Sequence, residues 1–217
     1  MTESVSEKRA DRISADTEIA SAAPERLDLT GERILDAALA QFEEQGIKRS
    51  SVEAIARRAG VTRVTVYRRF PRKTALVEAV VAREARRLVA EVDARTSTVD
   101  DAEARAVESF VQLIGWLRDH ALVRRLLATE PESVLRTLTV DAGPVVAFGT
   151  AYIAEQIRRG QREGAFPAYD PEPVAGIFAR FIQSLILTPD ALGRLDDEAT
   201  AREFVRAHVA PMLRRDG

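Results

Sequence analysis

The sequence predicts an all-α protein in which a small N-terminal head is joined by a long helix to a larger helical body. Apolar residues recur at intervals of three and four along most of the chain, the spacing that places them on one face of a helix. No segment alternates apolar and polar residues for long enough to indicate a strand. We expect a tail over residues 1–29, a head over 30–75 whose linking helix continues to about 96, and a helical body over 76–217.

The composition excludes several classes of protein. The chain has 217 residues, of which 46% are hydrophobic and 30% charged, as in an ordinary globular protein. It has no cysteine, so it can form neither a disulfide nor a thiolate metal site. No apolar run approaches the ~20 residues that cross a membrane, and the N-terminus lacks the apolar core of a signal peptide. We therefore expect a cytoplasmic protein with no membrane partner, no cofactor and no metal.

Residues 1–29 predict a disordered tail. They are rich in Ser, Ala, Asp and Glu and show no sustained apolar periodicity. Basic arms of some DNA-binding proteins enter the minor groove, but residues 1–30 carry seven acids against four bases. We therefore interpret this segment as a passive leader.

The head is expected to begin with a helix that opens at Thr30 or Gly31 and ends at Gly46. Its apolar face consists of Ile34, Leu35, Ala38, Leu39 and Phe42. This face can pack against the two shorter helices that follow, which gives a head of three helices.

The two shorter helices have recognisable ends. Ser50 is a suitable N-cap for the first, with Glu53 completing a capping box, and Gly60 can adopt the left-handed conformation that ends it. Thr62 can cap the second. A helix, a glycine-containing turn and a second helix form the helix-turn-helix layout, whose second helix enters the major groove of DNA.

The segment from Lys48 to Lys73 is strongly basic. It carries nine Lys and Arg residues against one acid, in a chain whose formal net charge is −2. Such a concentration of cations indicates a polyanionic partner. A solvated basic face is the alternative, but the charge coincides with the helix-turn-helix pattern, which favours double-stranded DNA.

The start of the second short helix is expected to read base edges. Arg63 can pair with guanine in two hydrogen bonds, and Val64 or Thr65 can meet a thymine methyl group. Phosphate contacts fix the register, and donors at a helix N-terminus suit a phosphate. The predicted DNA-binding residues are Ser50, Ser51, Thr62, Arg63, Val64, Thr65, Tyr67, Arg69 and Lys73.

These residues resemble a known family. The segment GVTRVTVYRRFPRKTALVEAV is similar to the recognition helix and following residues of the TetR family of bacterial transcriptional regulators. The resemblance covers roughly residues 31–80 and departs from the family at Arg72, where a capping Ser or Asn is common. The shared features are an AxxAGV pattern before the turn, Thr65, Tyr67, Arg68, Phe70, Lys73, and Ala75-Leu76.

The resemblance implies a homodimeric repressor that leaves a palindromic operator when a small apolar or amphipathic ligand binds in the body. It also implies phosphate contacts for Tyr67 and Lys73, and dimerisation through the last two long helices. A DNA-binding dimer without a ligand, acting as an activator or a constitutive repressor, is the alternative. A helical protein-interaction module is a second alternative.

The body is predicted to be helical throughout. A long helix over 74–96 can act as a lever between head and body. Proline and glycine residues then separate further helices, which are expected over 101–119, 122–128, from Pro131, from Pro144 to Gly160 or Gly164, over 172–187 and over 196–214.

Aromatic residues of these helices indicate a ligand pocket. An apolar cavity with a few polar groups is typical of small-ligand sites, although each of these side chains could equally be ordinary core. The predicted lining is Phe110, Leu113, Trp116, Phe148, Tyr152 and Phe166. We interpret His120 as a residue at a helix end rather than a ligand-binding group.

The helix over 172–187 is apolar nearly all round, so it must be covered on several sides. A second subunit is the predicted cover, with an internal core as the alternative. The predicted interface residues are Ile177, Phe178, Phe181, Ile182, Leu185, Phe204, Val205 and Met212.

The sequence does not predict an enzyme. It contains no GxSxG motif, P-loop, HExxH motif or dinucleotide fingerprint. The acidic pairs Asp100-Asp101 and Asp196-Asp197 stand at predicted helix starts, where carboxylates favour the helix dipole. Capping therefore explains them without catalysis.

Overall fold

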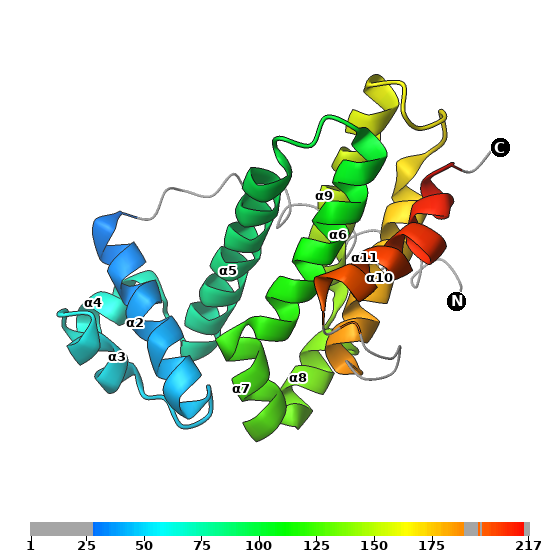
Figure 1. Ribbon diagram of the computed structural model, residues 1–217. Coiled ribbons are helices and arrows are strands. Elements are labelled where there is room, and N and C mark those ends of the chain that lie inside the picture. The colour runs from blue at the N-terminus through cyan, green and yellow to red at the C-terminus, as the bar shows by residue number, and fades with distance from the viewer. Residues whose placement is uncertain (1–27, 189–194, 196, 215–217) are drawn as a thin grey trace, which may run out of the picture.

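The computed structural model describes residues 28–188, 195 and 197–214, so residues 1–27 of the predicted tail lie outside the described residues. The tail was predicted two residues too long, because Asp28 caps α2 and Leu29 begins it. Every regular element within those ranges is helical, which confirms the all-α prediction (Figure 1). The helices are α2 (Leu29–Gln45), α3 (Val52–Arg58), α4 (Arg63–Arg69), α5 (Lys73–Thr96), α6 (Ala102–Asp119), α7 (Ala121–Thr129), α8 (Pro131–Leu138), α9 (Gly143–Arg162), α10 (Pro171–Leu187) and α11 (Glu198–Phe204).

The head consists of α2, α3 and α4 packed against the first half of α5. Its core is continuous and tight, and Ile34, Leu35, Phe42 and Ile55 are fully buried in it. The start of α2 is closed by Asp28, whose carboxylate accepts a hydrogen bond from the backbone N–H of Gly31 at 2.8 Å. The apolar face that the sequence predicts for α2 therefore forms the centre of the head.

The start of α3 differs from the prediction by one residue. Ser51 is the N-cap, and its hydroxyl accepts from the N–H of Ala54 at 3.1 Å. Ser50 is buried, and its hydroxyl donates to the carbonyl oxygens of Gly46 at 2.6 Å and Gln41 at 3.2 Å. The predicted capping box of Ser50 and Glu53 is therefore wrong, because the Ser50 hydroxyl instead donates to backbone carbonyls near the C-terminal end of α2.

The long helix α5 runs from the head along the body, as Figure 1 shows. Leu76 and Val80, near its start, belong to the core of the head. No side-chain hydrogen bond caps α5 at Arg72, where the sequence departs from the family pattern. The described helices include no single one long and apolar enough to span a membrane, and α8 and α9 meet that requirement only as a pair bent by 57°.

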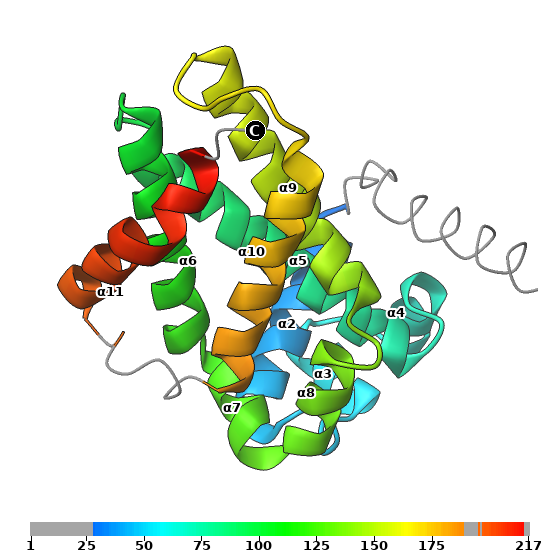
Figure 2. The same cartoon turned by 90° about the vertical axis from the view of Figure 1, so that its right-hand side faces the viewer.

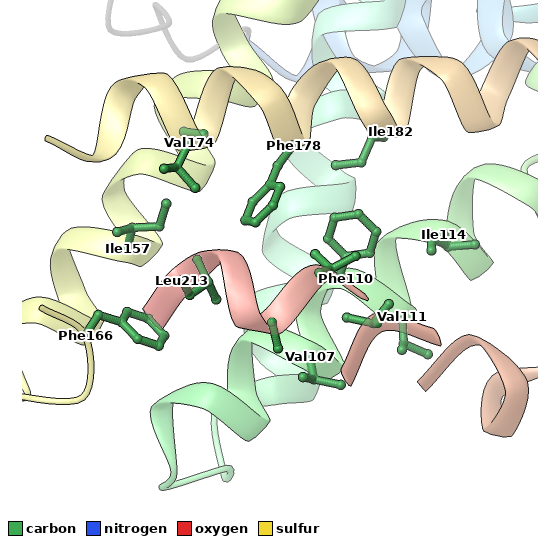
Figure 3. Packing of buried hydrophobic residues seen from close by; sticks show 14 of the residues in the cluster. Val107, Phe110, Val111, Ile114, Ile157, Phe166, Val174, Phe178, Ile182 and Leu213 are labelled. Carbon is green, nitrogen blue, oxygen red and sulfur yellow. The ribbon is translucent and has the colours of Figure 1, made fainter. Parts of the chain in front are cut away.

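The body is built around α6, α9, α10 and the C-terminal helix. Figure 2 shows α9 and α10 side by side, and Figure 3 shows Phe110, Phe178 and Leu213 directed into the shared interior. The helix predicted over 196–214 is not regular, because α11 continues as a π-helical segment, Val205–Val209, and then a 3-10 segment, Ala210–Arg214. Its buried residues Val205, Val209 and Leu213 follow at intervals of four.

Candidate DNA-binding head and ligand cavity

The outer surface of α4 is exposed although the helix is firmly anchored. Thr62 caps it by accepting from the N–H of Thr65 at 3.2 Å, and Val66 is buried in the core of the head. Val64, near the start of α4, is 77% exposed. An apolar side chain next to exposed polar residues on one helical face suits a groove that presents both methyl groups and hydrogen-bonding edges.

Arg63 lies across the front of this face in the free protein. Its guanidinium forms an ion pair with Glu53 at 2.5 Å and lies 5.2 Å from the centre of the Tyr67 ring. The hydrogen bond to the Tyr67 hydroxyl, followed by the charge of Glu53, raises the pKa of Arg63, so the side chain is a permanent cation. To reach a base edge, Arg63 must exchange Glu53 for the base.

Two predicted phosphate contacts have partners within the head. Arg69 pairs with Asp28 at 2.5 Å, and its side chain is only 23% exposed. The pKa of Asp28 is lowered, chiefly by the hydrogen bond from the Gly31 N–H and then by the one from Arg69. A phosphate would therefore compete with Asp28 for Arg69.

Lys73 has more hydrogen-bond partners within the head than Arg69. Its Nζ donates to the carbonyl oxygens of Ile47 at 2.5 Å, Ser50 at 2.6 Å and Lys48 at 3.4 Å. An ammonium group has three donors, so all of them are engaged with the turn between α2 and α3. Ser50 is buried beneath the same turn, whereas Ser51 and Tyr67 remain accessible.

In the described part of the head, three other cations are exposed and unpaired. Within the described residues, the exposed guanidinium groups of Arg57, Arg68 and Arg72 have no hydrogen-bond or ion-pair partner. The sequence shows only that the segment from Lys48 to Lys73 is basic. The structure distinguishes these unpaired arginines from Arg58, which pairs with Glu44 at 2.7 Å.

The body contains an apolar cavity of about 70 Å³ between α6, α9, α10 and the C-terminal segment. Four of the six predicted pocket residues line it, namely Phe110, Leu113, Tyr152 and Phe166. Arg105, Ser109 and Gln156 add polar groups that the sequence reasoning missed. No apolar periodicity marks these three residues, so only their position in the fold identifies them.

Trp116 and Phe148 lie elsewhere, in contrast to the expectation. Trp116 lines a separate, mostly polar cleft of about 320 Å³, and its ring centroid lies 4.1 Å from that of His120. Phe148 is 40% exposed on the outside of α9. Both residues lie in apolar stretches of their helices, and the sequence does not show which apolar residues of a helix face the cavity.

Tyr152 connects the cavity to the linking helix. Its hydroxyl donates to the carboxylate of Asp93 on α5 at 2.7 Å, and Gln156 approaches the same oxygen at 3.4 Å. Burial, followed by the Asp93 carboxylate, raises the pKa of Tyr152, so its hydroxyl remains a donor. The wall of the cavity is therefore hydrogen-bonded to the helix that carries the head.

Most of the predicted interface residues belong to the core of the monomer. Phe178, Ile182 and Val205 are buried, and the rings of Phe181 and Phe204 stack with centroids 6.2 Å apart. Leu185 and Met212 are partly buried against the same core. Of the predicted set only Ile177 is exposed, at 49%, because α6, α9 and the C-terminal helix cover the other faces of α10.

Comparison with known proteins agrees with this architecture. The family model for bacterial regulatory proteins of the tetR family matches residues 34–80. An uncharacterized HTH-type transcriptional regulator of Mycobacterium bovis is 30% identical over 179 residues, which cover 82% of this chain and 92% of the relative. The A-factor receptor protein of Streptomyces griseus is 28% identical over 195 residues, covering 87% of this chain and 65% of that protein.

Solved structures show the same fold. The TetR family repressor AlkX from a Dietzia strain superimposes with a TM-score of 0.65 at 20% identity, covering 88% of this chain and 97% of that one. The fatty acid degradation regulator FadR from Bacillus halodurans gives a TM-score of 0.58 at 19% identity, covering 83% and 96%. With its helix-turn-helix head, its helical body and a relative matched over nearly its full length, the chain belongs to the tetR family of bacterial regulatory proteins.

Proposed function

We propose that this chain is a homodimeric repressor that binds a palindromic operator through α4 and releases it when a small amphipathic ligand enters the body. The exposed face of α4, with Val64 and Arg63 beside unpaired cations, is the observation that carries the DNA-binding part. Such a regulator would act in the bacterial cytoplasm, where the DNA is. Base edges would be read by residues 62–65, and the free arginines would contact phosphates.

The homodimer is supported by apolar residues that the monomer leaves open. Val145 and Phe148 on α9 and Ile177 on α10 are each about 40–50% exposed, and α9 and α10 lie side by side. A second copy related by a two-fold axis would cover the same surface on both subunits. It would also present two α4 helices to one duplex, so the operator should be a palindrome.

The ligand response is supported by the cavity and its connection to α5. An apolar interior with Arg105, Ser109 and Gln156 at its edge suits a molecule with an apolar part and a hydrogen-bonding group. A dry cavity of ~150 Å³ accommodates benzene, so a cavity of about 70 Å³ must enlarge to admit a ligand. Enlargement would displace Tyr152 and with it the contact to Asp93 on α5. That a relative is named as a receptor for A-factor agrees with a ligand-responsive body.

The decisive experiment is fluorescence anisotropy of duplex DNA from the upstream region of the gene, titrated with protein at several salt concentrations and with random competitor DNA. We expect binding that survives the competitor and weakens steeply with salt. Arg63→Ala should relax specificity at one base position, at a cost of about 1–3 kcal/mol. An equal loss for every base at every position would rule out base reading by Arg63.

Lys73→Ala should weaken binding to all sequences alike. If Lys73 contacts a phosphate, the slope of log affinity against log salt should fall by roughly 1. If it only supports the turn, the affinity falls and the slope is retained.

The anisotropy assay and a thermal-shift panel together separate the alternatives. A DNA-binding dimer without a ligand would bind the operator but show no thermal shift across a panel of apolar and amphipathic compounds. A protein-interaction module would fail to bind duplex DNA at ~150 mM salt.

A further inference from the structure

Glu130, between α7 and α8, is a buried carboxylate that neither DNA reading nor the ligand cavity explains. Its side chain is 4% exposed and does not cap α8. It follows Leu122 and Leu126 at intervals of four along α7, and both of these leucines pack into the core of the head. One face of this body helix therefore belongs to the head, and Figures 1 and 2 show α7 beside α2.

The carboxylate of Glu130 binds the turn between α2 and α3. Its Oε1 accepts a hydrogen bond from the backbone N–H of Lys48 at 2.8 Å, although the two residues are 82 positions apart. Gly46 makes this approach possible. Its φ of 80° is a conformation that favours glycine, and a Cβ at this position would overlap Oε1 of Glu130.

The same turn is also held by α5. Lys73 donates to the carbonyl oxygens of Ile47 and Ser50, while Glu130 accepts the N–H of Lys48 that lies between them. Two side chains of opposite charge, one from α5 and one from the α7–α8 junction, thus hold the turn. Ser51, the N-cap of α3, follows it directly, and α3 in turn packs against α4.

We propose that Glu130 is a positioning residue for DNA binding, through which the body holds the α2–α3 turn and thereby the orientation of α3 and α4. This inference rests on the proposed function of the head. Its consequence is specific: a movement of α7 would withdraw the acceptor from Lys48 and release the turn without any change in the residues that touch DNA.

A set of variants matched in charge isolates the hydrogen bond. Glu130→Gln removes the charge but keeps an acceptor, whereas Glu130→Met removes both at similar volume. Glu132→Gln is the control, because it also removes one negative charge near Lys48. Glu132 pairs with the Lys48 side chain at 3.7 Å, and both side chains are more than half exposed. Charge loss alone should strengthen DNA binding slightly in all three variants.

The first measurement is amide hydrogen exchange at Lys48 without DNA. We expect exchange about 10-fold faster in Glu130→Met than in Glu130→Gln or Glu132→Gln, because only the first variant lacks an acceptor. In the anisotropy assay, Glu130→Met should bind every duplex about 10-fold more weakly with unchanged base preference, and Glu130→Gln should restore affinity to within about 3-fold of the wild type. A role confined to stability would shift the unfolding midpoint but leave the affinity of the folded protein unchanged.

Equal exchange at Lys48 in Glu130→Met and Glu130→Gln, or equal DNA affinity of the two, would overturn the proposal. Should Glu130→Met not fold, Glu130→Asp replaces it, since it keeps the charge but withdraws the carboxylate by one methylene. Faster exchange at Lys48 and weaker DNA binding are then expected, and wild-type behaviour in both would contradict the proposal. Wild-type protein that binds no DNA would refute the proposed function instead, whereas the exchange at Lys48 would still report on the contact.

Discussion

The head and the body are built from similar helices, but the core of the head is packed more completely than the interior of the body. Phe42 and Ile55 in the head are fully buried, and Asp28, Ser51 and Thr62 cap its first three described helices with side-chain hydrogen bonds. In the body, α6, α10 and α11 are capped in the same way, but α7, α8 and α9 begin without such a bond, and α8 contains no buried residue. The body also leaves a cavity and exposes large apolar side chains.

The difference in packing corresponds to different requirements on the head and on the body. A surface that reads base edges must hold its side chains in one geometry, which a tightly packed and capped head provides. A region that changes shape with a ligand needs parts of lower local stability. The comparison therefore predicts that equivalent substitutions have unequal effects in the two regions.

The largest contrast is expected between two phenylalanines. Phe42→Ala removes a fully buried ring from the head and should lower the free energy of unfolding by about 3–5 kcal/mol. Phe148→Ala removes a ring that is 40% exposed in the monomer, so it should change monomer stability by about 0.5 kcal/mol or less. Urea unfolding at low protein concentration measures both.

Phe148→Ala should instead weaken the dimer, which sedimentation of a dilution series would detect. Equal losses of monomer stability in the two variants would show that the body is packed as completely as the head. An unchanged dimer would remove Phe148 from the proposed interface.

A contrast of intermediate size is expected between two helical glycines of the body. A Cβ at Gly160 would overlap the ring of Phe166, so Gly160→Ala should destabilise the protein by about 1–3 kcal/mol. A Cβ at Gly115 meets nothing within 4 Å, so Gly115→Ala should stabilise α6 by about 0.5–1 kcal/mol. Thermal unfolding of both variants tests the pair.

Because Phe166 also lines the cavity, Gly160→Ala should additionally change any ligand-induced thermal shift. A neutral result for Gly160→Ala would mean that the cavity absorbs the displaced ring, and the body would then be more compliant than its packing indicates.

The smallest effect concerns the ion pair that fastens α11 to α6. Glu108 accepts two hydrogen bonds from Arg202, at 2.5 and 2.9 Å, and they lower the pKa of the carboxyl below its ordinary value of 4.5. A lowered pKa contributes stability that is complete above the ordinary value and is lost as the pH falls through the lowered one. Glu108→Gln should therefore cost less than about 1 kcal/mol at pH 7 and nothing at strongly acidic pH.

Urea midpoints of wild type and Glu108→Gln across this pH range provide the measurement. The pKa of Asp28 in the head is lowered as well, so the acid sensitivity of the two regions should have the same sign. A difference between wild type and variant that grows toward low pH would contradict the assigned direction.

Much of the fold could be predicted from the periodicity and punctuation of the chain. The positions of α2 to α6, α9 and α10 follow from apolar spacing, glycine and proline, because helix formation depends on neighbours three and four residues away. The helix-turn-helix was also predictable, since its turn, caps and charge lie within one segment. The N-cap of α3 was missed by one residue because Ser50 and Ser51 are locally equivalent, and only the carbonyls at the end of α2 distinguish them.

The sequence by itself thus determined the helices, the basic face of the head and the family to which they belong. Only the tertiary structure decided which aromatic residues share a cavity, which cations are already paired, and that Glu130 of the body contacts the turn of the head. The reason is physical. A helix is defined by short-range hydrogen bonds and spacing, whereas a contact between residues 82 positions apart depends on how every intervening helix packs.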